Sequence, residues 1–195
     1  SLDALIANQV MAELNSLCDE FNTALLLITH DLPLAARWCQ RMAILDQGKI
    51  VEDSMTLNIL KDPQSAMGKR LVKSARAREG LHIPSSLIGS VILEVDRLRC
   101  WHFVSSWPWQ VNWIKAVDQV SFSLFSGETL AIVGPSGCGK STLCRALIGL
   151  TPIRGGSVKL NGDYLFNLTG QFLRATRQEI QMVFQDPFSC LNPKM

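Results

Sequence analysis

The chain has 195 residues, of which 47% are hydrophobic and 18% are charged, and its formal net charge at pH 7 is +2. This size suffices for one full domain or for parts of two, whereas a near-neutral charge without a dense basic run disfavours a nucleic-acid-binding protein. The apolar runs are far shorter than the ~20 residues that a membrane-spanning helix needs, and the N-terminus lacks the basic start and long apolar core of a signal peptide. We therefore expect a cytoplasmic protein that is able to dock on a membrane protein.

The first predicted element is an amphipathic helix at residues 4–21. Its apolar side chains recur three or four positions apart, which places them on one face. The members of this apolar face are Ile6, Val10, Leu14, Leu17 and Phe21. We expect this face to pack on a sheet.

A short strand and a hairpin follow the helix. Residues 23–29 form an apolar run that is typical of a strand buried on both faces of a parallel sheet, and His30 comes directly after its carboxyl end. Pro33 suits the first turn of a short helix. Residues 42–52 contain two strand-like runs about a glycine and predict a β-hairpin.

The middle of the chain predicts a domain boundary. Residues 61–80 are basic and helical in composition, and residues 81–90 carry Pro, Gly and Ser, which is typical of a linker. A new strand-like run begins at residues 91–103. Residues 105–113 contain three tryptophans and predict a loop, and residues 117–134 predict two strands separated by a turn.

The second of these strands runs directly into the sequence "GPSGCGKST" at residues 134–142, which satisfies the pattern G-x-x-x-x-G-K-[ST]. Helical spacing of apolar residues follows it. A strand, a glycine-rich loop and a helix in this order let backbone N–H groups and the positive end of a helix converge on phosphate oxygens. Lys140 would reach the β and γ phosphates, Ser141 would offer its hydroxyl to Mg²⁺, and Thr142 would add a donor. The loop predicts nucleotide binding without naming a family.

Two stretches carry a more specific resemblance. Residues 126–150, "SGETLAIVGPSGCGKSTLCRALIGL", and residues 183–193, "VFQDPFSCLNP", together resemble the ATPase subunits of ABC transporters, within them the group that serves oligopeptide, dipeptide and nickel importers. Cys190 stands where that group usually has Ser. The resemblance covers residues 91–195. It implies an α/β P-loop NTPase fold of the ABC ATPase type, incomplete here, with a parallel sheet and an antiparallel β element before the phosphate loop.

The resemblance also implies the ligands and the residues that hold them. ATP and Mg²⁺ are the expected cofactors, with Ser141 and Gln185 at the metal and Gln185, His30 and Lys140 in catalytic roles. Trp113 or Trp109 is the expected adenine contact, of which Trp113 is preferred. The nucleotide-binding positions are Gly134, Pro135, Ser136, Gly137, Cys138, Gly139, Lys140, Ser141, Thr142 and Trp113.

The first part of the chain resembles the opposite end of the same ATPases. "SLD" at the N-terminus resembles the end of a D-loop, with Asp3 as its aspartate, and residues 28–52 resemble the H-loop region, with His30 as the switch histidine. We therefore expect residues 1–80 to be the C-terminal part of a first ATPase domain. Residues 81–90 would be a linker, and residues 91–195 the N-terminal part of a second domain, as in a fused tandem protein.

Two motifs of the family do not occur in the 195 residues: an LSGGQ-like signature and an apolar strand that ends in Asp-Glu. We therefore expect ATP hydrolysis powering solute import in the parent protein, and no hydrolysis by this excerpt alone. The expected partners are transmembrane permease subunits, a second ATPase domain or subunit and, indirectly, an extracytoplasmic solute-binding protein, with no nucleic acid. The expected location is the cytoplasmic face of the inner membrane, as a peripheral protein.

Two other functions stay open: a soluble tandem ABC ATPase of the translation or DNA-repair kind, and a non-catalytic remnant that binds nucleotide weakly or not at all.

One structural expectation separates a composite domain from two unrelated pieces. In the family the strand that leads to the H-loop lies beside the strand that leads to the phosphate loop. Residues 24–29 and 129–133 should therefore pair in parallel within this chain.

Overall fold

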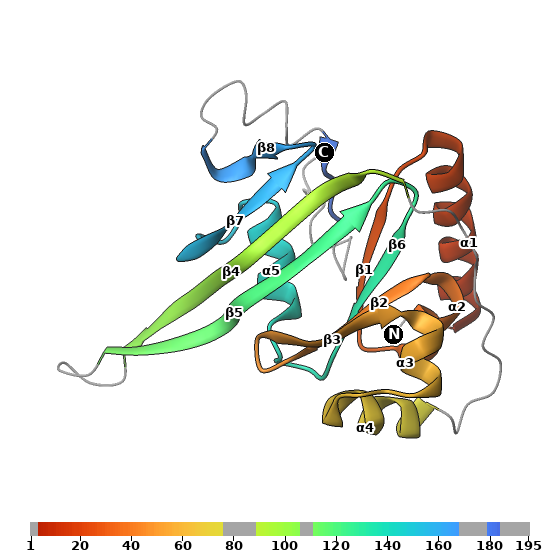
Figure 1. Cartoon of the computed structure of the whole chain (residues 1–195), viewed down its shortest axis with the longest axis horizontal. Coiled ribbons are helices and arrows are strands. Elements are labelled where there is room, and N and C mark those ends of the chain that lie inside the picture. Colours follow the sequence, from red (N-terminus) through yellow and green to blue (C-terminus); the bar gives the residue numbers. More distant parts are fainter. Residues whose placement is uncertain (1–3, 76–88, 106–110, 168–178, 184–195) are drawn as a thin grey trace, which may run out of the picture.

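The computed structural model describes residues 4–75, 89–105, 111–167 and 179–183, which form five α-helices and two four-stranded sheets (Figure 1). The helices are α1 (Ala4–Phe21), α2 (Leu32–Trp38), α3 (Thr56–Lys61), α4 (Ala66–Ala75) and α5 (Lys140–Leu147), with a 3-10 helix at Leu165–Asn167. The strands are β1 (Leu25–Thr29), β2 (Arg41–Asp46), β3 (Lys49–Met55), β4 (Val91–Ser105), β5 (Val111–Phe125), β6 (Thr129–Val133), β7 (Gly155–Leu160) and β8 (Asp163–Tyr164).

The first sheet combines three strands from the first part of the chain with β6 from the second part. Its strand order is β1-β6-β2-β3, so that β6 lies between β1 and β2 and runs parallel to both. Leu27 pairs with Ala131 on one side of β6, and Ala43 pairs with Ile132 on the other. The predicted parallel pairing of residues 24–29 with residues 129–133 is therefore confirmed, and one composite sheet contains both parts of the chain.

Apolar clusters cover both faces of β6, whose five residues are all buried. Leu130 and Ile132 face a cluster that includes α5 and the second sheet, while Ala131 and Val133 face a cluster that includes α2, α3 and α4. Because successive side chains of a strand point to opposite faces, a strand buried on both faces must be apolar throughout. This explains the uninterrupted apolar run at residues 130–133, which follows the buried Thr129.

The second sheet has the strand order β5-β4-β7-β8 and is antiparallel. Strands β4 and β5 form a long ribbon that projects from the rest of the molecule in Figure 1. The prediction of a loop at residues 105–113 is wrong at both of its ends, because β4 continues through Ser105 and β5 begins at Val111. The many tryptophans pointed to a loop, whereas aromatic and β-branched residues also favour strands.

Helix α1 forms as predicted, but its orientation differs from the expectation. Val10, Leu17 and Phe21 are exposed, whereas Met11 is buried. Two asparagines on the Met11 side make the contacts that orient the helix: Asn8 accepts a hydrogen bond from the indole N–H of Trp38, and Asn15 contacts the Thr129 hydroxyl. Polar contacts therefore set the face that turns inward, which hydrophobic periodicity alone did not indicate.

A buried ion pair links the two parts of the composite sheet. Arg41 Nη1 at the start of β2 lies 3.4 Å from Oε1 of Glu128 and donates to the carbonyl of Ser123 at 2.7 Å. The same guanidinium binds both carboxylate oxygens of Asp53 at 2.8 and 2.7 Å. Burial alone would lower the pKa of Arg41, but the two carboxylates outweigh burial and raise this pKa. Arg41 therefore stays charged and compensates the fully buried Glu128 side chain.

Replacing Arg41 with Met should destabilise the chain strongly, because it leaves Glu128 buried without its cation. Breaking a buried pair in this way costs about 3–5 kcal/mol. The free energy of unfolding from urea titration measures the loss. Arg97→Met is the control, because Arg97 pairs with Asp96 at the surface and an exposed pair contributes about 0–1 kcal/mol. Equal losses in the two variants would contradict the assigned role of Arg41.

Candidate functional site

The carboxyl ends of three parallel strands meet at one edge of the first sheet. Thr29, the last residue of β1, pairs with Val133, the last residue of β6, and Ile44 of β2 pairs with the same Val133. His30 therefore leaves the sheet beside the loop at residues 134–142. Loops at this edge of an open α/β sheet are the usual place for a ligand.

The glycines of the loop are required by close backbone contacts. A Cβ on Gly134 would collide with the carbonyl oxygen of Leu45 in β2, and a Cβ on Gly139 would collide with the carbonyl oxygen of Ala116 in β5. Gly139 also has a φ of +108°, which L side chains rarely adopt. The loop thus has its shape because two other strands press against it.

The loop concentrates positive electrostatic potential. Gly139 is the N-cap of α5 and has no side chain to cap the helix, so the first backbone N–H groups of α5 are open to a ligand. Nζ of Lys140 donates to the carbonyl oxygens of Gly134 and Pro135, at 2.8 and 2.9 Å. Ser141 is exposed in the first turn of α5. The arrangement suits an anion with several oxygens.

The other loop positions differ in exposure. Ser136 and Gly137 are exposed, Thr142 is half-buried, and Cys138 is buried with 6% exposure. Cys138 packs into the cluster between the two sheets, with its Sγ 3.8 Å from Nζ of Lys140. Cys138 therefore fills space beneath the loop.

Trp113 lies on β5, three residues before the Ala116 carbonyl that contacts the loop. Its ring is 41% exposed, meets the edge of Phe103 with centroids 5.7 Å apart, and lies 4.6 Å from the guanidinium carbon of Arg154. The cation of Arg154 was not anticipated, because it is 41 positions away in the sequence and nothing local marks it. An indole that is partly open can stack on a planar ligand.

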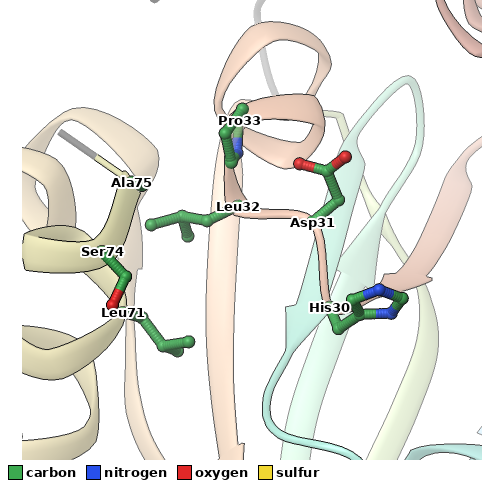
Figure 2. A pocket seen from close by; sticks show the side chains of 7 residues that line it. All are labelled: His30, Asp31, Leu32, Pro33, Leu71, Ser74 and Ala75. Atoms are coloured by element: carbon green, nitrogen blue, oxygen red, sulfur yellow. The ribbon is translucent and has the colours of Figure 1, made fainter. Parts of the chain in front are cut away.

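His30 is exposed and borders a cavity of about 320 Å³ between α2 and α4. Figure 2 shows its imidazole directed away from Leu71 and Ser74, which line the opposite wall. The next residue, Asp31, is the N-cap of α2, and its Oδ1 accepts from the N–H of Leu34 at 3.2 Å. Asp31 thus fixes the chain direction just after His30.

Several predicted site residues lie outside the described part of the chain, namely Asp3, Trp109 and Gln185. Within the described residues, no group of three or more His, Cys, Asp or Glu side chains is placed to hold a metal ion. Ser141 lies in the first turn of α5, and its hydroxyl oxygen would suit a magnesium ion that is bound together with phosphate. Among the described helices, none has the length and apolar character needed to cross a membrane.

Part of the chain matches a known family, and the whole chain aligns with known proteins. Residues 117–195 match the family described as ABC transporter. The whole chain aligns with the peptidoglycan transport ATP-binding protein YejF of Agrobacterium fabrum, at 29% identity over 36% of that protein, and with the glutathione import ATP-binding protein GsiA of Escherichia coli, at 32% identity over 35% of that protein. A bacterial Atm1-family ABC exporter with ATP bound aligns with 62% of this chain and 22% of its own, at 23% identity and a TM-score of 0.33.

The chain is thus similar in sequence to ATP-binding proteins of ABC transporters, over residues 117–195 for the family match and over its whole length for the two named relatives. The predicted α/β fold of the ABC ATPase type, with parallel strands around the phosphate loop and antiparallel strands before it, is confirmed. The chain spans about a third of the length of the curated relatives that it matches, 36% and 35% for the two named above. The activity, substrates and partners of the whole protein are therefore matters for proposal.

The cavity beside His30 depends on Glu52 of β3. Its carboxylate accepts hydrogen bonds from the hydroxyl and N–H of Ser65, at 2.6 and 2.9 Å, and from the N–H of Gln64 at 2.8 Å. These contacts hold the start of α4, which supplies one wall. Burial raises the pKa of Glu52, but the hydrogen bonds and the charge of Lys69 outweigh burial and lower this pKa.

Glu52→Gln should therefore destabilise the chain at pH 7 and not at low pH. A depressed pKa means that the charged form contributes stability above the unfolded pKa of about 4.3, and that this stability is lost as the pH falls through the folded value. We expect a difference of about 1–2 kcal/mol at pH 7, measured by urea unfolding from pH 7 to pH 3, with the exposed Glu13→Gln as control. A difference that persists unchanged at pH 3 would contradict the role of the Glu52 charge.

Proposed function

We propose that this chain binds ATP with Mg²⁺ at residues 134–142 and forms part of the ATPase of an ABC importer for peptides or similar solutes. The observation that carries the proposal is the loop itself. It connects a fully buried parallel strand to a helix whose N-cap is a glycine, and the Lys140 ammonium lies on its carbonyls. The names of two relatives, which refer to peptidoglycan transport and glutathione import, support the class of solute.

Phosphate binding is assigned to the backbone of the loop and to Lys140. The N–H groups at the start of α5 would donate to the phosphate oxygens, and Lys140 would exchange the loop carbonyls for the β and γ phosphates. The hydroxyl of Ser141 would bind Mg²⁺, with Gln185 as a second ligand and Thr142 as an added phosphate donor. Bound magnesium would neutralise charge that develops on the phosphates.

His30 is proposed as the group that contacts the γ-phosphate. It follows β1, which pairs in register with the strand that leads into the loop, so its position is next to the loop at the same edge of the sheet. An imidazole there can hydrogen-bond an oxygen that gains charge when water attacks. Gln185 would orient that water.

Trp113 is proposed as the adenine contact. Its partly exposed ring lies on β5, three residues before the Ala116 carbonyl that touches the loop, and this supports an aromatic contact for a nucleotide held there. Arg154 covers part of this ring. A base that stacks on Trp113 would therefore use the remaining open face or displace the guanidinium.

The proposed setting follows the resemblance to the peptide importers. Residues 1–80 would come from one ATPase domain and residues 91–195 from the next, joined by residues 81–90. The proposed partners are permease subunits, contacted through the region of Gln185, a second ATPase domain or subunit and, indirectly, a solute-binding protein. The chain would then work at the cytoplasmic face of the membrane. Because the 195 residues contain neither an LSGGQ-like signature nor an apolar strand ending in Asp-Glu, we expect binding without turnover.

Calorimetric titration with MgATP tests the proposal. The chain should bind ATP saturably without releasing phosphate, and Lys140→Ala should abolish or greatly weaken binding, because a charged hydrogen-bond donor to phosphate is lost. Arg145→Ala is the matched control, because Arg145 is exposed on the same helix. This variant should bind MgATP as the unsubstituted chain does. Trp113→Ala should weaken binding by a smaller factor.

Two outcomes would overturn the proposal. One is the absence of ATP binding by the folded, unsubstituted chain. The other is an equal affinity for MgATP in the unsubstituted chain and in Lys140→Ala. If the unsubstituted chain released phosphate steadily and Lys140→Ala did not, this would contradict the expectation that binding occurs without turnover.

A further inference from the structure

The turn between β2 and β3 touches the phosphate loop, although it belongs to the other part of the chain. The N–H of Gly48 donates to the carbonyl oxygen of Cys138 at 2.9 Å, and the carbonyl of Gly48 accepts from the N–H of Asp118 at 2.8 Å. Next to it, Nζ of Lys49 lies 3.7 Å from Oδ2 of Asp118. The turn is therefore hydrogen-bonded both to the loop and to β5.

Three backbones meet around one carbonyl at this point. A Cβ on Gly48 would lie 2.8 Å from the carbonyl oxygen of Ala116, and a Cβ on Gly139 would collide with the same oxygen. Gly48 and Gly139 are themselves close, since a Cβ on Gly139 would lie 3.6 Å from the Cα of Gly48. A side chain at residue 48 would push this contact apart.

The bond from Gly48 fixes the orientation of one peptide group of the loop. In a trans peptide the carbonyl and the N–H point in opposite directions. When the Cys138 carbonyl points to Gly48, the N–H of Gly139 points away from the turn. A carbonyl in the reverse orientation would present negative charge to a bound anion, and one N–H donor would be lost.

We infer that the β2–β3 turn is a positioning element for phosphate binding, with Gly48 as the residue on which it depends. Gly48 itself does not touch the ligand. It holds the Cys138–Gly139 peptide so that the Gly139 N–H is presented to the phosphate. This inference rests on the proposed nucleotide binding at residues 134–142, and it adds a residue from the first part of the chain to the binding machinery of the second part.

The chain contains a matched control for this inference. Strands β7 and β8 are joined by a turn of the same kind, in which Asn161 and Gly162 have φ values of +50° and +91°, against +47° and +78° for Gln47 and Gly48. A Cβ on Gly162 meets nothing within 4 Å. Alanine at either position therefore imposes similar backbone strain, but only residue 48 contacts the loop.

The experiment compares Gly48→Ala with Gly162→Ala in the full 195-residue chain. Calorimetry gives the Kd for MgATP, thermal unfolding gives Tm, and hydrogen exchange of the free protein gives the protection of the peptide that covers residues 135–140. We expect Tm to fall in both variants, and to fall further in Gly48→Ala, where the added Cβ also meets the Ala116 carbonyl oxygen. We also expect at least about tenfold weaker MgATP binding and faster loop exchange in Gly48→Ala, with less than about twofold change in Gly162→Ala.

A second pair of variants separates strain from contact. Asn adopts positive φ more readily than Ala, so Gly48→Asn should recover part of the Tm but not the affinity, because its Cβ still collides. Equal effects of the changes at residues 48 and 162 on affinity and on loop exchange would overturn the inference. If the unsubstituted chain binds no MgATP, the proposed function fails. Hydrogen exchange of residues 135–140 still decides whether the turn holds the loop.

Discussion

The parallel pairing of β6 with β1 on one side and with β2 on the other is the interaction on which the site depends. It places the end of β6, where the phosphate loop begins, between the ends of two strands from the first part of the chain. The apolar clusters on both faces then keep water away from the backbone hydrogen bonds of β6. Two further contacts secure this arrangement: the Arg41–Glu128 pair, and the Gln40 amide oxygen that accepts from the N–H of Thr129 at 2.7 Å.

The loop inherits its shape from its surroundings. The backbone of Gly134 lies against β2, the backbone of Gly139 lies against β5, and the carbonyl of Cys138 accepts a hydrogen bond from the β2–β3 turn. A glycine-rich loop is conformationally free in isolation, so a defined anion site requires contacts that select one conformation. In this chain much of that selection comes from residues before 75, which gives the first part of the chain a role in the site besides supplying His30.

The sequence predicted the elements near the site well, because buried parallel strands and the phosphate-loop pattern are strong local signals. The pairing of β1 with β6 followed from family resemblance, since their separation of about a hundred residues gives no local signal. The inward face of α1 was wrong because Asn8 and Asn15 find polar partners in Trp38 and Thr129, which periodicity does not encode. Helix α3 and the contacts of Gly48 and Arg154 depend on tertiary approach and were not anticipated.

Nuclear Overhauser effects between β1, β6 and β2 in the isotope-labelled chain test the central claim most directly. A composite sheet requires backbone contacts between Leu27 and Ala131 and between Ala43 and Ile132, the register partners in the sheet. In a mixture of labelled and unlabelled chains, these contacts should stay within one chain. Their absence in the folded protein, or their appearance between chains only, would contradict a composite sheet that builds the phosphate loop within a single chain.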